Sequence, residues 1–200
     1  MSEHDPSACI APIPADRMPR IPPERMTPAQ QVAAAELEAG PRGRVQGPYV
    51  PILRSPGFMT PAQKLGAYIR FECPLDLRIN EMAALMTARH WTQQFEFHVH
   101  RPHALKAGLR AAIIDAIAEG RRPDDMAGDE TVLYDFLTEV FATRGACDAT
   151  YRKAVDTFGE SGVIDILGIA GYYAMLAMIM NVARTALPDG AAHPLKPMPY

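Results

Sequence analysis

The chain has 200 residues, a length that fits one domain with extensions rather than several domains. Hydrophobic residues make up 48% and charged residues 22%, which excludes a chain that is disordered throughout. The net charge of -3 gives no electrostatic basis for a nucleic-acid partner or an anionic membrane surface.

Prolines divide the chain. Seventeen of the 19 lie outside residues 75–187, where only Pro102 and Pro123 occur. Because a proline inside a helix costs about 3 kcal/mol, long helices are expected in this central block. The division predicts a flexible N-terminal arm over residues 1–26, a helical domain over 27–187 and a C-terminal tail over 188–200.

The three cysteines, Cys9, Cys73 and Cys147, form no C-x-x-C pair. This usage indicates a reducing compartment and no thiolate metal site. The N-terminus carries acidic residues and prolines where a signal peptide would need a basic start and an apolar stretch. We therefore expect a cytoplasmic location.

In the first part of the chain, Thr27-Pro28 and Thr60-Pro61 each look like an N-cap followed by proline at the first helical position. They predict short helices over 28–39 and 61–71. The segment between them is rich in glycine and proline, which indicates an ordered surface loop. It lacks the phosphate-loop pattern.

From Leu77 onward apolar residues recur at the spacing of one helix face. Pro102 is expected to end or bend one helix, and Asp148 is expected to cap another. No stretch alternates long enough to predict a strand, so we expect an all-α domain. The predicted helices cover 77–91, 93–100, 109–118, 131–141 and 148–158.

Residues 162–183 are apolar except for Asp165 and a few polar groups such as Asn181, and are long enough to span a membrane. Asp165 would cost about 2.5 to 3.5 kcal/mol at the centre of a bilayer, and no basic cluster precedes the segment. A helix that is apolar on all sides is also typical of the centre of a helical oligomer. We therefore favour a soluble central helix over a membrane span, with Tyr172 and Tyr173 as core residues.

Four of the six histidines lie between His90 and His103. On a helix, Glu96 and His100 share one face, with Gln93 one turn earlier. A carboxylate that accepts from one imidazole nitrogen leaves the other nitrogen for proton exchange with a substrate. Glu81 could face the same space from the preceding helix. The alternative is a partly solvated helix face with an ordinary ion pair.

His98 and His100 point in nearly opposite directions on a helix, so they cannot bind one metal ion together. A metal held by Glu96, His100 and a third ligand elsewhere stays open. His103, after Pro102, is expected to be a solvated residue at a helix start. Arg54 and Arg101 are among the cations that could hold an acidic substrate.

Several segments together resemble a known superfamily. They are ILRSPGF, NEMAALMTARHW, QQFEFHVHRPHALKAGL and GESGVIDILGIAGYYAMLAMIMNVARTALP. Over residues 20–190 the chain is similar to the longer branch of the carboxymuconolactone decarboxylase and alkylhydroperoxidase D-like superfamily. This resemblance implies an alkylhydroperoxidase D-like helical bundle with proline-rich arms.

The peroxidase branch of that superfamily has a Glu, a C-x-x-C and a His, which fall here on Glu81, Gln93, Glu96 and His100. Both cysteines are replaced. A dithiol peroxidase needs a low-pKa thiolate and a resolving thiol, so peroxidase activity is disfavoured. The resemblance instead implies a carbon-carbon lyase that acts on a small lactone carboxylic acid.

The resemblance also implies roles for these residues. His100 is the expected proton donor or oxyanion partner, Glu96 and Glu81 orient it or relay protons, and Gln93, Arg54 and Arg101 bind substrate. No cofactor is expected, because the lactone carbonyl accepts the electrons. A homo-oligomer is implied, a trimer or hexamer or else a dimer. No metal, nucleic-acid or membrane partner is expected.

Two alternatives stay open at this stage. One is a different cofactor-free lyase, isomerase or hydrolase that acts on a related small acid. The other is a non-catalytic helical oligomer or small-acid-binding protein, in which Glu96 and His100 merely pair.

Overall fold

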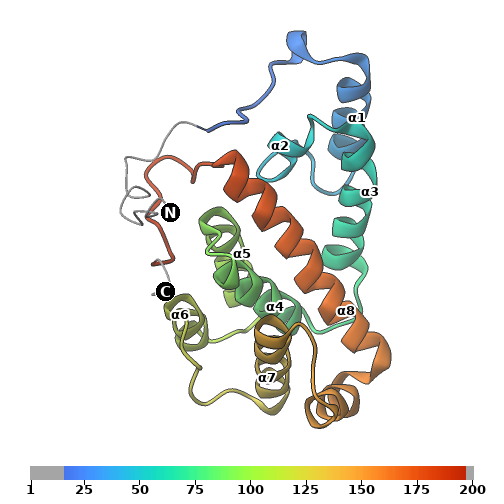
Figure 1. Cartoon of the computed structure of the whole chain (residues 1–200). Coiled ribbons are helices and arrows are strands. Elements are labelled where there is room, and N and C mark those ends of the chain that lie inside the picture. The colour runs from blue at the N-terminus through green and yellow to red at the C-terminus, as the bar shows by residue number, and fades with distance from the viewer. Residues whose placement is uncertain (1–15, 197–200) are drawn as a thin grey trace, which may run out of the picture.

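The computed structural model describes residues 16–196, and every regular element in that range is a helix (Figure 1). The predicted all-α class is confirmed. The α-helices are α1 Pro28–Ala39, α2 Tyr49–Ile52, α3 Pro56–Ala67, α4 Leu77–His90, α5 Gln94–Lys106, α6 Ala111–Glu119, α7 Gly128–Thr143 and α8 Asp148–Ala183. A 3-10 turn covers Pro23–Arg25, and a π-helical turn, η3, covers Tyr68–Glu72.

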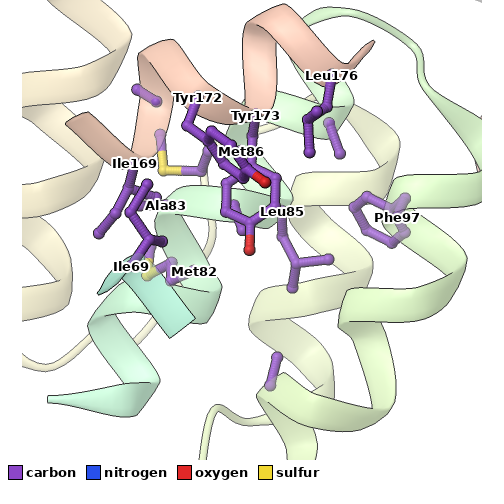
Figure 2. Packing of buried hydrophobic residues seen from close by; sticks show 14 of the residues in the cluster. Ile69, Met82, Ala83, Leu85, Met86, Phe97, Ile169, Tyr172, Tyr173 and Leu176 are labelled. Carbon is purple, nitrogen blue, oxygen red and sulfur yellow. The ribbon is translucent and has the colours of Figure 1, made fainter. Parts of the chain in front are cut away.

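Helix α4 forms the centre of the domain. It packs against α5, α6, α7 and α8, and ten of its 14 residues are buried. The buried alanines Ala83, Ala84 and Ala88 leave little side-chain bulk between α4 and its neighbours. Figure 2 shows residues of α4 in one apolar cluster with residues of α8. Burial of this cluster is the main stabilising contribution to the fold.

A three-residue turn joins α4 to α5. Thr92 in this turn has a φ of 48°, the left-handed region that β-branched residues rarely adopt. The next residue, Gln93, is the N-cap of α5, and its side-chain oxygen accepts from the backbone N–H of Glu96 at 3.1 Å. So short a turn brings α5 back against α4, as the packing of the two helices shows.

The N-terminal helices agree with prediction in one case and differ in the other. Helix α1 covers the predicted residues 28–39, with a Thr27 and Gln30 capping box. Helix α3 begins at Pro56, so the prediction of a start at Thr60-Pro61 was wrong. The N–H that Pro61 lacks would have bonded to the carbonyl of Gly57, an exposed residue that water can reach.

The later helices also run further than predicted. Helix α5 continues through Pro102 to Lys106, so Pro102 does not end it. Helix α8 joins the two predicted segments across a kink at Gly159, whose φ of 71° and ψ of 168° are not helical. Its N-cap is Cys147, and Asp148 is the first helical residue instead of the cap.

Parts of both predicted arms are hydrogen-bonded to the helical domain. The Arg17 N–H donates to the carbonyl of Ala183 at 2.8 Å, and Arg20 donates to the carbonyl of Val45 at 2.6 Å. Near the C-terminus the Gln94 side chain bonds to both backbone groups of Leu195, at 2.8 and 3.0 Å. The remaining parts of the arms, residues 1–15 and 197–200, lie outside the described residues.

Helix α8 is long and apolar enough to cross a membrane by length and composition, with a mean hydropathy of 1.9 in its most apolar window. Half of that stretch is buried inside the chain. The other face carries exposed apolar side chains: Ile164, Leu167, Met178 and Val182.

A substitution at Gly66 tests the contact between α3 and α8. A Cβ at Gly66 would overlap the hydroxyl of Tyr172, which cannot retreat freely because it is hydrogen-bonded to the hydroxyl of Tyr49 at 2.7 Å. We expect Gly66→Ala to lower the free energy of unfolding by about 1 to 3 kcal/mol, measured by denaturant unfolding. Gly57→Ala, in open space on the same helix, should leave stability unchanged or slightly raised. Equal stability of the two variants would contradict the packing described.

Candidate active site

A cavity of about 270 Å³ lies between α5, α8 and the segment that leads into α2. Polar and charged side chains from these three elements and from the turn η3 reach it, with apolar residues between them. The side chains that the chemistry below uses are Arg42, Arg44, Tyr49, Arg70, Glu96, His100 and Tyr173, and the apolar wall includes Phe95, Val99, Leu176 and Met180.

His100 and Glu81 meet across the interface of α5 and α4. His100 Nδ1 lies 2.7 Å from Glu81 Oε2, and the two side chains are only 6% and 12% exposed. Since a carboxylate accepts hydrogen bonds, Nδ1 carries a proton and donates it to Glu81. Nε2 is then the nitrogen through which His100, as a residue of the cavity wall, can exchange a proton. The expected proximity of Glu81 to His100 is thus observed.

Glu96 behaves differently from the sequence interpretation. It was expected to pair with His100, but neither of its carboxyl oxygens has a hydrogen-bond partner among the described residues. Burial raises the pKa of the Glu96 carboxyl well above its usual range, which favours the protonated form. Glu96 is therefore a buried neutral acid in the cavity wall, and Glu81 is the carboxylate that orients His100.

Two tyrosines of α8, Tyr172 and Tyr173, line the cavity and also belong to the apolar cluster (Figure 2). The ring of Tyr173 lies edge-on to the His100 ring, with centroids 4.7 Å apart. Burial, followed by the nearby carboxyls of Glu81 and Glu96, raises the pKa of the Tyr173 phenol. Tyr172 shares a hydrogen bond with Tyr49 at 2.7 Å. Both tyrosines therefore stay protonated and can only act as neutral hydrogen-bonding groups.

Three arginines supply the charge of the cavity. Among the described residues, no carboxylate forms an ion pair with Arg42, Arg44 or Arg70, whereas Arg78, Arg101, Arg121 and Arg122 each have at least one. The Arg42 guanidinium lies over the Tyr49 ring, 4.9 Å from its centroid. Arg70 Nη2 donates to His103 Nε2 at 2.8 Å. Because these cations have no carboxylate partner among the described residues, they can bind an anionic ligand.

The other residues singled out from the sequence lie outside this cavity wall. Arg54 donates to the backbone carbonyls of Pro19 and Val50, and Arg101 pairs with Asp115 on the surface. Neither is therefore placed to bind a ligand here. Gln93 is buried and supports the site indirectly, because its side chain caps α5 and donates to Asn181 of α8 at 3.0 Å.

His103 was expected at a solvated helix start, and that expectation was wrong. It lies within α5, is partly buried and accepts from Arg70. Burial and the Arg70 charge lower the pKa of His103, consistent with a neutral ring that accepts. In the described part of the chain, no group of three His, Cys, Asp or Glu side chains is arranged to hold a metal ion.

Sequence reasoning missed the cavity's arginines because Arg42 and Arg44 lie in the glycine- and proline-rich segment expected to be a surface loop. The available signal for a binding site was the pair Arg42 and Arg44, two cations close together in a segment expected to be ordered. Tyr173 was assigned to the core, which is correct for its ring but overlooks its place in the cavity wall. No protein-family model matches the chain, and no curated protein matches it in sequence.

The buried Glu96 carboxyl should make stability depend on pH. The unfolded chain ionises it near a pKa of about 4.3, whereas the folded chain holds the proton to higher pH. Stability is thus fully present below the unfolded pKa and is lost as pH rises toward the folded pKa, by about 1.4 kcal/mol per unit of difference. Glu96→Gln does not ionise, so its melting temperature should rise relative to the wild type between about pH 4 and pH 8.

Thermal melts across this pH range measure the effect. Glu38→Gln, at an exposed site on α1, is the matched control for the loss of one carboxylate. A melting-temperature difference for Glu96→Gln that stays constant across the range would show that Glu96 is not held neutral.

Proposed function

We propose that this protein is a cofactor-free carbon-carbon lyase that removes a carboxylate from a small lactone acid. The observation that carries the proposal is the Glu81–His100 hydrogen bond beside a cavity with three arginines and no charged acid of its own. The proposal also rests on the resemblance of residues 20–190 to the carboxymuconolactone decarboxylase branch. It includes an alkylhydroperoxidase D-like arrangement of the helices.

We assign binding of the substrate carboxylate to the arginines. Arg42 and Arg70 come from separate elements, so a carboxylate between them would be held from two directions. The bound carboxylate must not be stabilised too strongly, because only interactions that strengthen in the transition state raise the rate. Arg42 and Arg70 have no carboxylate partner among the described residues, so we assign them to binding the substrate acid and assign the rate to the groups that act on the dienolate.

Loss of carbon dioxide leaves a dienolate whose charge resides on the lactone oxygen. We assign the protonated form of Glu96 as a donor for this oxygen, a role that requires its carboxyl, whose two oxygens are buried in the structure, to turn toward the ligand. His100, as an imidazolium held by Glu81 and protonated at Nε2 from solvent, delivers that proton to carbon. The lactone carbonyl accepts the electrons of the broken bond, so this scheme assigns no step to a cofactor.

Assembly and location belong to the same proposal. The exposed apolar residues Ile164, Leu167, Met178 and Val182 follow one face of α8, and a second copy of the chain would cover them. The protein is proposed to be a cytoplasmic homo-oligomer, trimeric or hexameric, with α8 in the subunit contact rather than in a membrane.

The test is carbon dioxide release from a panel of small lactone acids, with the product mass determined. We expect His100→Ala to lower kcat by about 10²- to 10⁴-fold, because it removes the proton donor. Glu81→Gln should also lower kcat, because it removes the charge that stabilises the imidazolium. His98→Asn, on the same helix but outside the cavity wall, is the matched control and should retain the wild-type rate.

An unchanged rate in His100→Ala would contradict the assignment of the proton donor. Tight binding of lactone acids by the wild type without carbon dioxide release would instead support a small-acid-binding protein. Calorimetry with the same panel separates these two outcomes.

A further inference from the structure

We propose that the cavity also catalyses double-bond isomerisation of unsaturated lactone acids that carry no ring carboxylate. This inference rests on the residue roles in the proposed function, but it concerns a different substrate and a different reaction. In it, a proton leaves one ring carbon and returns to another, with no carbon-carbon bond broken.

The site holds more proton-transfer groups than decarboxylation uses. Decarboxylation needs one proton delivered to carbon and none removed. The site holds two groups that handle protons, the His100 imidazole and the Glu96 carboxyl, four residues apart on α5 and both in the cavity wall. The Glu81 bond to His100 Nδ1 leaves Nε2 of the neutral ring as a base. Decarboxylation uses His100 only as a proton donor, so the neutral, basic form of the ring has no role in that reaction.

The protonation of the dienolate by His100 is reversible, and the reverse step gives neutral His100 a function as a base. If His100 protonates a dienolate at carbon, the same transition state lets neutral His100 remove that proton again. Loss of carbon dioxide is not required for this step. Isomerisation adds one step to this, the removal of a proton from the γ-carbon by neutral His100, which gives the same dienolate without loss of a carboxylate.

The atoms and electrons balance without a co-reactant. His100 Nε2 takes the proton from the γ-carbon of an α,β-unsaturated lactone, and the C–H electron pair moves into the ring to give a dienolate. Glu96 donates a hydrogen bond to the lactone oxygen, as a carboxylic acid kept neutral by its surroundings can do. The imidazolium then returns its proton to the α-carbon, which gives the β,γ-unsaturated isomer and regenerates neutral His100.

The cavity has places for both ends of such a molecule. Arg42 and Arg70 would hold a side-chain carboxylate, and Phe95, Val99 and Leu176 form an apolar wall for the ring. A volume of about 270 Å³ is close to the lower end of ordinary small-molecule sites, which suits a one-ring acid.

The experiment uses the full chain and a five-membered lactone with one ring double bond and one acetate side chain. Proton NMR in deuterium oxide follows deuterium incorporation at the ring carbons, and absorbance follows the shift of the double bond. We expect the wild type to accelerate both at least about 100-fold over buffer, and His100→Ala to lose about 10²- to 10⁴-fold. His98→Asn should match the wild type.

Two further variants address the neutral acid and guard against misfolding. Glu96→Gln keeps a hydrogen-bond donor and should retain the rate within about tenfold, whereas Glu96→Leu lacks the donor and should lose about 100-fold or more. Circular dichroism of each variant confirms that its helices are intact before rates are compared.

Carbon dioxide release from a ring-carboxylated lactone is measured on the same preparations, so the two proposals fail separately. Carbon dioxide release without deuterium incorporation would overturn isomerisation and leave the lyase standing. Deuterium incorporation without carbon dioxide release would support isomerisation and overturn the lyase. The absence of both activities would overturn both proposals.

Discussion

The hydrogen bond between Glu81 and His100 is the constraint on which the site depends. It joins α4, the buried centre of the domain, to α5, which carries the rest of the proton-handling groups. The bond fixes which imidazole nitrogen is free. Its length of 2.7 Å follows from the packing of α5 against α4 across a three-residue turn. The left-handed conformation of Thr92 and the Gln93 cap are therefore part of the site's construction, although neither residue is in the cavity wall.

The charge of the cavity depends on the burial of its ionisable groups as well as on residue type. Glu96 has no partner among the described side chains, and its burial raises the pKa of the carboxyl, which favours the neutral form that does not cancel the charge of the arginines. Arg42 and Arg70 are placed instead by a tyrosine ring and a neutral histidine, which leave the positive charges uncompensated. A buried acid that costs stability at neutral pH thus coincides with a cationic cavity, a combination typical of functional sites.

The sequence predicted the fold class, helix α1 and the central helix α4 because their periodicity and caps are local properties. It also predicted that Glu81 could meet His100, through helical spacing and a family resemblance. It did not predict that Glu81 would displace Glu96 as the partner, because that depends on how α5 rotates against α4. Arg42 and Arg70 were missed for a similar reason: tertiary packing alone brings a loop and a π-helical turn to one cavity.

Nitrogen-15 NMR of the histidine rings tests the central claim most directly, with His100→Asn used to assign the His100 signals. At a pH where the His100 ring is neutral, we expect the proton on Nδ1, hydrogen-bonded to Glu81, and an unprotonated Nε2. In Glu81→Ala this preference for Nδ1 should be lost, because the acceptor is gone. A ring in the wild type with its proton on Nε2 and a bare Nδ1 would contradict the account.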